Sequence, residues 1–144
     1  MFTLCLYRDY VPGTSAFAAT QFASTGDIIR FPAVQLNTGG DYNSSSGVFT
    51  CRIPGLYWFS VSLSKQYGPI VNYVGCFFTI NGSKKVYLYK DPTQDIEGYT
   101  TTGSIAVHVN VGDRVYVGGC YNQPIPIWNY DATYFSGMLV KPDM

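Results

Sequence analysis

Hydrophobic and polar residues alternate along most of this chain, and this two-residue period is typical of β-strands that bury one face. The clearest run is 57–64, where two aromatic and two aliphatic residues alternate with one tryptophan and three serines. The same alternation recurs at 2–7, 74–80, 84–89, 105–109, 115–117 and 133–140. No stretch of a dozen residues has helical spacing. The pattern therefore predicts an all-β protein.

Glycine, proline and asparagine separate the predicted strands. Asn81-Gly82 stands between two of them and supplies the positive φ angles of a tight hairpin turn. Pro12-Gly13, Asp91-Pro92 and Gly112-Asp113 end other runs. Short strands punctuated in this way favour an antiparallel sandwich or jelly roll.

Composition narrows the class of protein. The chain has 144 residues, enough for one domain with a core. Hydrophobic residues make up 47% and charged residues 12%, which excludes a disordered chain. Lys plus Arg equals Asp plus Glu at nine each, so the net charge is zero and a nucleic-acid partner is not expected. No apolar run approaches the roughly 20 residues of a membrane span.

Catalytic chemistry finds little support. His108 is the one histidine, and it stands on the polar face of its predicted strand, where we expect it to face solvent. Metalloprotease, serine hydrolase, P-loop and dinucleotide-binding motifs are all missing from the sequence. We therefore expect a protein that is not an enzyme.

Four cysteines are present, Cys5, Cys51, Cys76 and Cys120. None belongs to a CxxC pair, which argues against a zinc ribbon or thioredoxin chemistry. An even number is compatible with two disulfides in any of three pairings.

One segment carries a spacing more specific than composition. Between residues 31 and 59, aromatic residues, one asparagine and one glycine follow at fixed intervals: Phe31, Asn37, Tyr42, Phe49, Gly55, Tyr57 and Phe59. This spacing closely resembles the signature of the C1q globular domain. Segments 112–115 and 134–139 also match that family, and the resemblance covers about 16–140. Val61 and Met138 depart from it, because the family has an aromatic residue at the first position and usually Phe at the second.

The resemblance implies a ten-stranded antiparallel jelly-roll sandwich of the C1q/tumour-necrosis-factor type. It implies a C1q domain over 16–144, preceded by an N-terminal extension over 1–15. Family members are secreted homotrimeric binding modules and not enzymes. No Gly-X-Y run is present, so this would be a collagen-less member.

Three functions are compatible with this family. The leading interpretation is a secreted lectin of innate immunity that recognises microbial surface carbohydrates. The alternative is a signalling ligand, like cerebellins or the C1q/tumour-necrosis-factor hormones, that binds a protein receptor. The third is a structural or matrix module whose function is trimer assembly.

The resemblance also implies a disulfide. Complement C1q chains carry cysteines at positions similar to Cys51 and Cys76, so we expect these two to be bonded. Cys5 and Cys120 could then pair within one chain, pair across subunits, or stay free.

Calcium is the one cofactor that the resemblance brings in, because some C1q-like trimers bind it near the three-fold axis through acidic side chains. The segment 90–97 occupies the corresponding loop, and its Asp91 and Asp95 are the candidate ligands. The alternative is a solvated acidic loop.

The segment from 120 to 133 is the leading candidate for ligand contact. Trp128 and Tyr130 offer flat apolar faces for a sugar ring, and Asn129 and Asp131 offer hydrogen bonds to its hydroxyl or acetamido groups. The alternative is that these aromatic residues pack against a neighbouring subunit or the base of the loop. Segments 66–72 and 37–42 are further candidates.

Overall fold

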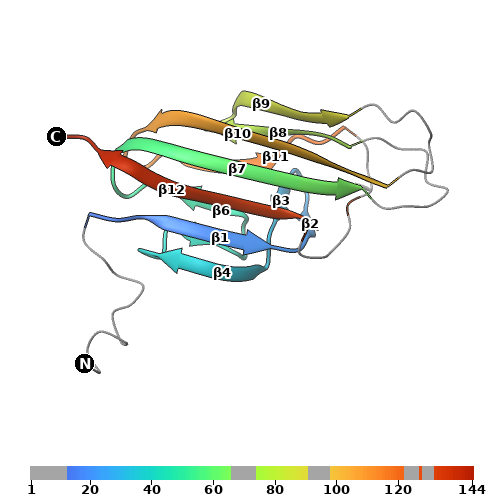
Figure 1. Ribbon diagram of the computed structural model, residues 1–144, viewed down its shortest axis with the longest axis horizontal. Coiled ribbons are helices and arrows are strands. Elements are labelled where there is room, and N and C mark those ends of the chain that lie inside the picture. The colour runs from blue at the N-terminus through green and yellow to red at the C-terminus, as the bar shows by residue number, and fades with distance from the viewer. Residues whose placement is uncertain (1–12, 66–73, 91–97, 122–126, 128–131) are drawn as a thin grey trace, which may run out of the picture.

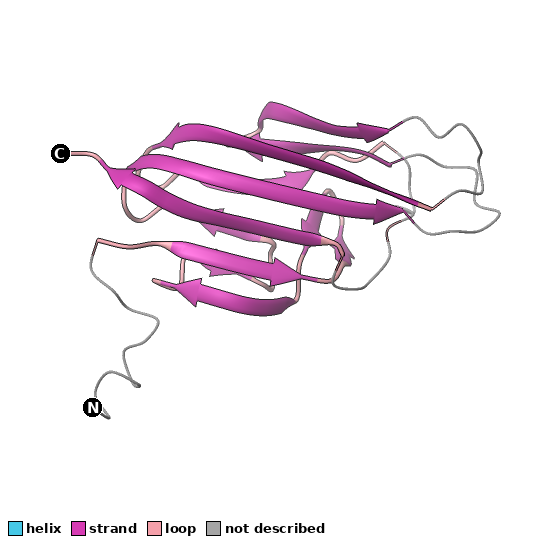
Figure 2. Cartoon of the chain, in the orientation of Figure 1, coloured by secondary structure: helices cyan, strands magenta, loops and turns pink. Residues whose placement is uncertain are grey.

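The protein is a sandwich of two antiparallel β-sheets packed face to face (Figure 1). The computed structural model describes residues 13–65, 74–90, 98–121, 127 and 132–144. Every regular element in this part of the chain is a strand (Figure 2). The all-β antiparallel class predicted from the alternating pattern is therefore confirmed.

The first sheet has five strands in the order β10-β7-β12-β1-β4. Their bounds are β1 Ala16–Thr20, β4 Ala33–Thr38, β7 Gly55–Lys65, β10 Tyr99–Val109 and β12 Tyr134–Pro142. β7 and β10 are both 11 residues long and pair throughout, from Gly55 opposite Val109 to Lys65 opposite Tyr99. This pair of long strands forms one edge of the sheet.

The second sheet has seven strands, and β11 is its centre. Its strands are β2 Ala23–Thr25, β3 Ile28–Arg30, β5 Tyr42–Asn43, β6 Val48–Thr50, β8 Val74–Ile80, β9 Ser83–Lys90 and β11 Arg114–Gly118. One edge of β11 pairs with β8, and the other pairs first with β6 and then with β3. Four of these strands are only two or three residues long, and with them the described residues form twelve strands where the resemblance implies ten.

Aromatic rings fill the space between the sheets. Five signature or family-matched aromatics predicted to lie in the core are at most 1% exposed, namely Phe31, Phe49, Tyr57, Phe59 and Phe135. Phe17 from β1 joins them, with its ring centroid 4.8 Å from that of Phe135 and 5.3 Å from that of Phe49. Such edge-to-face and offset pairs add to the free energy of burial. The aromatic residues of the signature therefore pack together in one core.

The predicted hairpin between β8 and β9 is confirmed. Asn81 and Gly82 have φ angles of 49° and 80°, the left-handed conformation that asparagine and glycine tolerate best. The Asn81 side chain also ties this turn to the next one, because its amide nitrogen donates to Asp113 Oδ1 at 2.8 Å and its oxygen accepts from Arg114 N at 2.8 Å.

The cysteine pairing differs from the expectation. Cys76 is bonded to Cys120, and Cys51 is a free thiol buried in the core, so the predicted Cys51–Cys76 disulfide is wrong. The reason is sheet topology: β11 lies between the strand that carries Cys76 and the strand that precedes Cys51. Cys120 extends β11 alongside β8, where Tyr121 N donates to Gly75 O at 2.9 Å. Cys5 lies outside the described residues.

Candidate functional site

The residues that flank three of the segments singled out in the sequence lie at the same end of the sandwich. Lys65, the last residue of β7, is opposite Tyr99 at the start of β10 and forms a bridge with Ile127. Val74 N donates a hydrogen bond to the Tyr99 hydroxyl at 3.0 Å, and Val74 pairs with Lys90. Residues that flank 66–73, 91–97 and 128–131 therefore contact one another at one end of the molecule.

The residues on either side of 128–131 are firmly held. Ile127 is buried, and Ala132 O accepts hydrogen bonds from the hydroxyls of Ser62 at 3.0 Å and Ser64 at 3.4 Å. Thr133 is fully buried, and its hydroxyl accepts from Ser64 N at 3.1 Å. Serines of β7 that the alternation placed on a polar face are thus used to fix the chain beside this segment.

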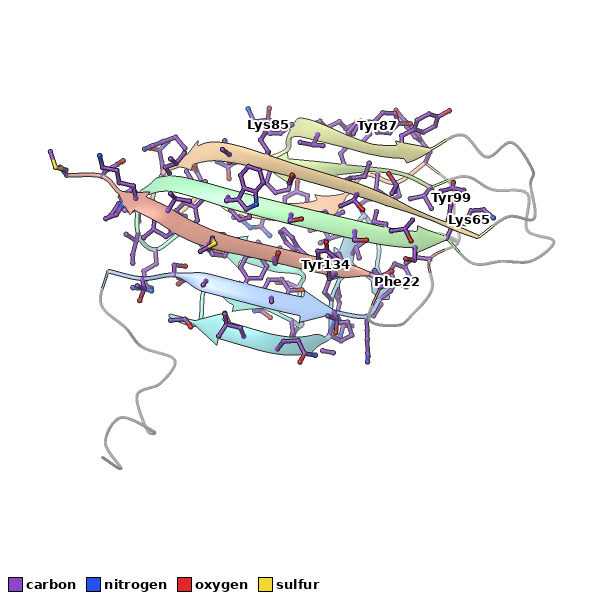
Figure 3. All side chains as sticks on the ribbon, viewed as in Figure 1. Phe22, Lys65, Lys85, Tyr87, Tyr99 and Tyr134 are labelled. Atoms are coloured by element: carbon purple, nitrogen blue, oxygen red, sulfur yellow. A yellow bond between two sulfur atoms is a disulfide. The ribbon has the colours of Figure 1, made fainter. Side chains whose placement is uncertain are left out.

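Lys65 is the unusual charge at this end. Its side chain is 1% exposed, and its ammonium lies 5.8 Å from the centre of the Tyr99 ring. Figure 3 shows the two residues next to each other where β7 ends and β10 begins. Sequence reasoning missed this residue, because a lysine that ends a strand is ordinarily solvated.

The predicted ligand and metal residues lie outside the described part of the chain. This holds for Trp128, Asn129, Tyr130 and Asp131 and for the calcium candidates Asp91 and Asp95. Within the described residues, no three histidine, cysteine or acidic side chains gather as metal ligands would. Both sets of residues remain predictions.

A second surface stands out on the five-stranded sheet. Its outer face carries Leu36 of β4, Trp58 of β7 and Met138 of β12, which are 49%, 45% and 51% exposed. Their side chains border a shallow hollow of about 200 Å³, which Ser60 and Ser136 also line. We call Leu36, Trp58 and Met138 the apolar face. Large apolar side chains that are exposed together on a sheet surface commonly mark a site of interaction with another molecule.

His108 lies where the pattern placed it, on the solvent side of β10. Its Nε2 is 2.9 and 3.0 Å from the two carboxylate oxygens of Asp143, and both side chains are about half exposed. This pair holds the C-terminal residues against β10. The contact is structural and is far along β10 from Tyr99.

Burial perturbs three groups inside the sandwich. Desolvation raises the pKa of Tyr42 to about 12, although its hydroxyl accepts from Phe31 N and donates to Phe31 O. Desolvation likewise raises the pKa of Tyr57, and the hydrogen bond between Tyr57 and Cys51 raises it further by a smaller amount. The pKa of the Cys51 thiol is raised by burial as well. These groups stabilise the core as neutral donors.

Solved structures define the class of fold. The chain superimposes on the globular domain of zebrafish complement 1qA with a TM-score of 0.71, at 19% identity over 90% of this chain and 99% of that one. It superimposes on murine APRIL with a TM-score of 0.72, at 11% identity over 88% of this chain and 99% of that one. Both likenesses show a jelly-roll sandwich.

The sequence assigns the family. The model of the C1q domain matches residues 14–140, so the chain belongs to the C1q domain family. It is 28% identical to a complement C1q subcomponent of Rattus norvegicus over 124 residues, which cover 85% of this chain and 47% of that one.

Two human relatives give the same picture. A complement C1q subcomponent of Homo sapiens is 29% identical over 90% of this chain and 51% of its own. Complement C1q tumor necrosis factor-related protein 2 of Homo sapiens is 27% identical over 80% of this chain and 39% of its own. The chain therefore spans about half or less of the length of the curated relatives that it matches.

No helix suited to crossing a membrane is found among the described residues.

Proposed function

We propose that this protein is a secreted, homotrimeric C1q-domain protein of innate immunity that recognises carbohydrate on microbial surfaces. The observation that carries the proposal is the firm attachment of the chain on both sides of 128–131, by Ile127 and by Ala132 and Thr133. An aromatic and polar segment held at both ends loses little conformational entropy when it binds. The C1q family supplies the class of binding module.

The roles of the four residues follow from their chemistry. Trp128 and Tyr130 would stack on the apolar face of a pyranose ring. The Asn129 amide would donate hydrogen bonds to its hydroxyl or acetamido groups and accept them, and the Asp131 carboxylate would accept them. Calcium at Asp91 and Asp95 remains part of the proposal, since the residues that flank this segment, Lys90 and Tyr99, adjoin those that flank the others.

Trimer formation would raise the effective affinity. A single sugar in an open site commonly gains about 4 to 5 kcal/mol, a dissociation constant near millimolar. Three sites on one rigid assembly raise the effective affinity on a clustered surface by roughly a hundredfold or more without new contacts. The apolar face of Leu36, Trp58 and Met138 supports such an assembly, because a second copy of the chain would remove it from water.

Two further parts of the proposal concern location and boundaries. The Cys76–Cys120 disulfide supports a secreted protein, because disulfides persist in oxidising compartments. We place the C1q domain at 16–144 and an N-terminal extension at 1–15.

The second candidate function is that of a signalling ligand for a protein receptor. The similarity to complement C1q tumor necrosis factor-related protein 2 favours it, since that relative is matched over 80% of this chain. In this case the same end of the sandwich would contact protein and would bind no free monosaccharide.

A glycan array with the refolded or secreted protein tests the proposal. We expect defined binding that a free monosaccharide inhibits and that Trp128→Ala abolishes while Trp128→Phe retains it in part, because Phe keeps a flat ring. Trp128→Ala should leave the oligomer unchanged in light scattering. A wild-type protein that binds no glycan at all would favour the receptor ligand. Dissociation of Trp128→Ala into monomers would make Trp128 a packing residue instead.

A further inference from the structure

A polar groove lies on the outer face of the seven-stranded sheet. It has a volume of about 480 Å³, within the range of small-molecule sites. Asp27 lines it from the turn before β3, Thr79 from β8, Lys84 from β9 and Tyr116 from β11. We call the hollow that these four residues line the outer-sheet groove. Four separate elements thus bring polar side chains to one hollow.

Two glycines shape one wall of the groove. A side chain at Gly118 would collide with the backbone oxygen of Asp27, and Gly119 N donates to that oxygen at 3.0 Å. Gly119 also has φ of 62°, which a residue with a side chain rarely adopts. Because these positions lack side chains, the turn at 26–27 lies directly against β11. Asp27 is held at the rim of the groove as a result.

The groove presents hydrogen-bonding groups of both kinds. The Asp27 carboxylate only accepts, the Lys84 ammonium only donates, and the Tyr116 hydroxyl does both. Within the described part of the chain, neither Asp27 nor Lys84 forms a side-chain hydrogen bond or a salt bridge. The hydrogen-bonding capacity of both charged groups is therefore available to a ligand. A ligand that satisfies both must carry both a hydrogen-bond donor and an acceptor.

Aromatic rings adjoin Lys84, one of the residues that line the groove. The Lys84 ammonium lies 4.3 Å from the centre of the Phe77 ring, and Phe77 stacks on Tyr87 of β9 at 4.6 Å. Tyr121 meets both rings edge to face and is 55% exposed, and it directly follows Cys120, which lines the groove. Figure 3 shows Tyr87 and Lys85 projecting from β9. Rigid aromatic residues give contact area at low entropic cost.

We propose that the outer-sheet groove binds a neutral pyranose unit of a glycan, with Asp27 and Lys84 directing its hydroxyls and Tyr121 contacting its apolar face. A sugar ring fits this chemistry because each hydroxyl both donates and accepts. An anionic ligand would meet the Asp27 carboxylate, and a purely apolar one would leave both charges without partners. The inference rests on the proposed carbohydrate ligand but assigns its binding to residues other than Trp128–Asp131.

Titration of the array's strongest glycan against three groove variants tests this inference. Asp27→Asn keeps the shape of the side chain, Lys84→Met keeps its length, and Tyr121→Ala removes the exposed ring. We expect each to weaken binding at least about tenfold, the effect of losing a hydrogen bond to a charged group or a stacked ring. Lys141→Met is the matched control, because Lys141 is an exposed lysine on β12 of the other sheet. It should bind like the wild type.

Each outcome separates the two proposals. If the wild type binds glycan, Trp128→Ala abolishes binding and the groove variants bind normally, the groove is not a sugar site and the proposed function stands. If the groove variants lose binding and Trp128→Ala retains it, the groove is the site and segment 128–131 is not. A wild type that binds no glycan overturns both. Unchanged thermal unfolding of the three variants excludes misfolding as the cause.

Discussion

Cys76 and Cys120 are joined by a disulfide that connects β8 to the residue following β11, with their Cα atoms 4.1 Å apart. The two residues are 44 positions apart in the chain, so the bond closes a long loop in the unfolded state. Restricting that loop stabilises the folded protein. The bond also fixes Tyr121 beside Gly75, directly after Cys120, which lines the outer-sheet groove.

Replacing both partners should therefore destabilise the protein strongly. We expect Cys76→Ala combined with Cys120→Ala to lower the free energy of unfolding by about 2 to 4 kcal/mol, from lost loop restriction together with a cavity at the buried Cys76. Urea unfolding followed by tryptophan fluorescence measures this. A non-reduced peptide map of the wild type should contain the linked 76–120 peptides. A map linking Cys51 to Cys76 would contradict the structure.

The Cys51 thiol should be inert in the folded protein. Burial raises its pKa, which lowers the reactive thiolate fraction, and Sγ donates to Ile53 O at 3.2 Å inside the core. In a Cys5→Ser variant we expect no reaction with Ellman's reagent at pH 8 and one equivalent after unfolding in guanidinium. Rapid labelling of the native variant would show that Cys51 is accessible.

Alkaline pH should destabilise the protein through Tyr42. Its pKa rises from 10.0 in the unfolded chain to about 12 in the fold, so the folded state binds the proton more tightly. The stabilisation is complete below about pH 10 and is lost as the pH rises through 12, up to about 3 kcal/mol. Tyr57 and Cys51, whose pKa values are also raised, add to the loss.

The variant Tyr42→Phe isolates this contribution. It should cost about 1 to 3 kcal/mol at pH 7, because Phe31 N, which donates to the Tyr42 hydroxyl at 3.0 Å, loses its buried partner. Its free energy of unfolding should then decline less steeply than that of the wild type between pH 9 and 12. Equal slopes for the two proteins would exclude Tyr42 as a source of alkaline unfolding.

The sequence predicts the fold well because the core depends on local alternation. Tyr57 and Phe59 face the core because alternate residues of a strand point to the same side, and the two-residue pattern in the sequence shows which side is apolar. The Cys51–Cys76 disulfide that the resemblance implies is wrong because similar cysteine positions do not determine which strands become neighbours. β11, from much later in the chain, lies between β8, which carries Cys76, and β6, which precedes Cys51.

Local sequence likewise does not show which distant residues come together in a candidate site. Segment 128–131 could be identified from its composition, whereas Asp27, Lys84 and Tyr116 are distant in the sequence and adjoin only after β3, β8, β9 and β11 assemble. Nothing in the local sequence of any one of them indicates a shared groove. Lys65 is similar, since its burial depends on Tyr99 and Ile127 meeting at the end of β7.

The apolar face should be the contact between the copies of a trimer. Trp58 and Met138 are opposite each other on β7 and β12, about half exposed, in a chain whose net charge is zero. Burying this face between copies removes apolar area from water at roughly 25 cal/mol per Å². A glutamate there would place an unpaired charge in the contact, at a cost of several kcal/mol. We therefore expect Trp58→Glu with Met138→Glu to abolish the trimer.

Sedimentation velocity at micromolar concentration measures the outcome. The wild type should sediment as three 15.9 kDa chains, and the double variant as one. Val111→Glu is the matched control, because Val111 is 67% exposed in the turn between β10 and β11, away from the apolar face, and should stay trimeric. A double variant that remains trimeric would show that the copies meet elsewhere. If the proposed lectin function is also correct, the monomeric variant should keep its affinity for a soluble monosaccharide and lose most of its binding to a clustered glycan surface, because only the second depends on three linked sites.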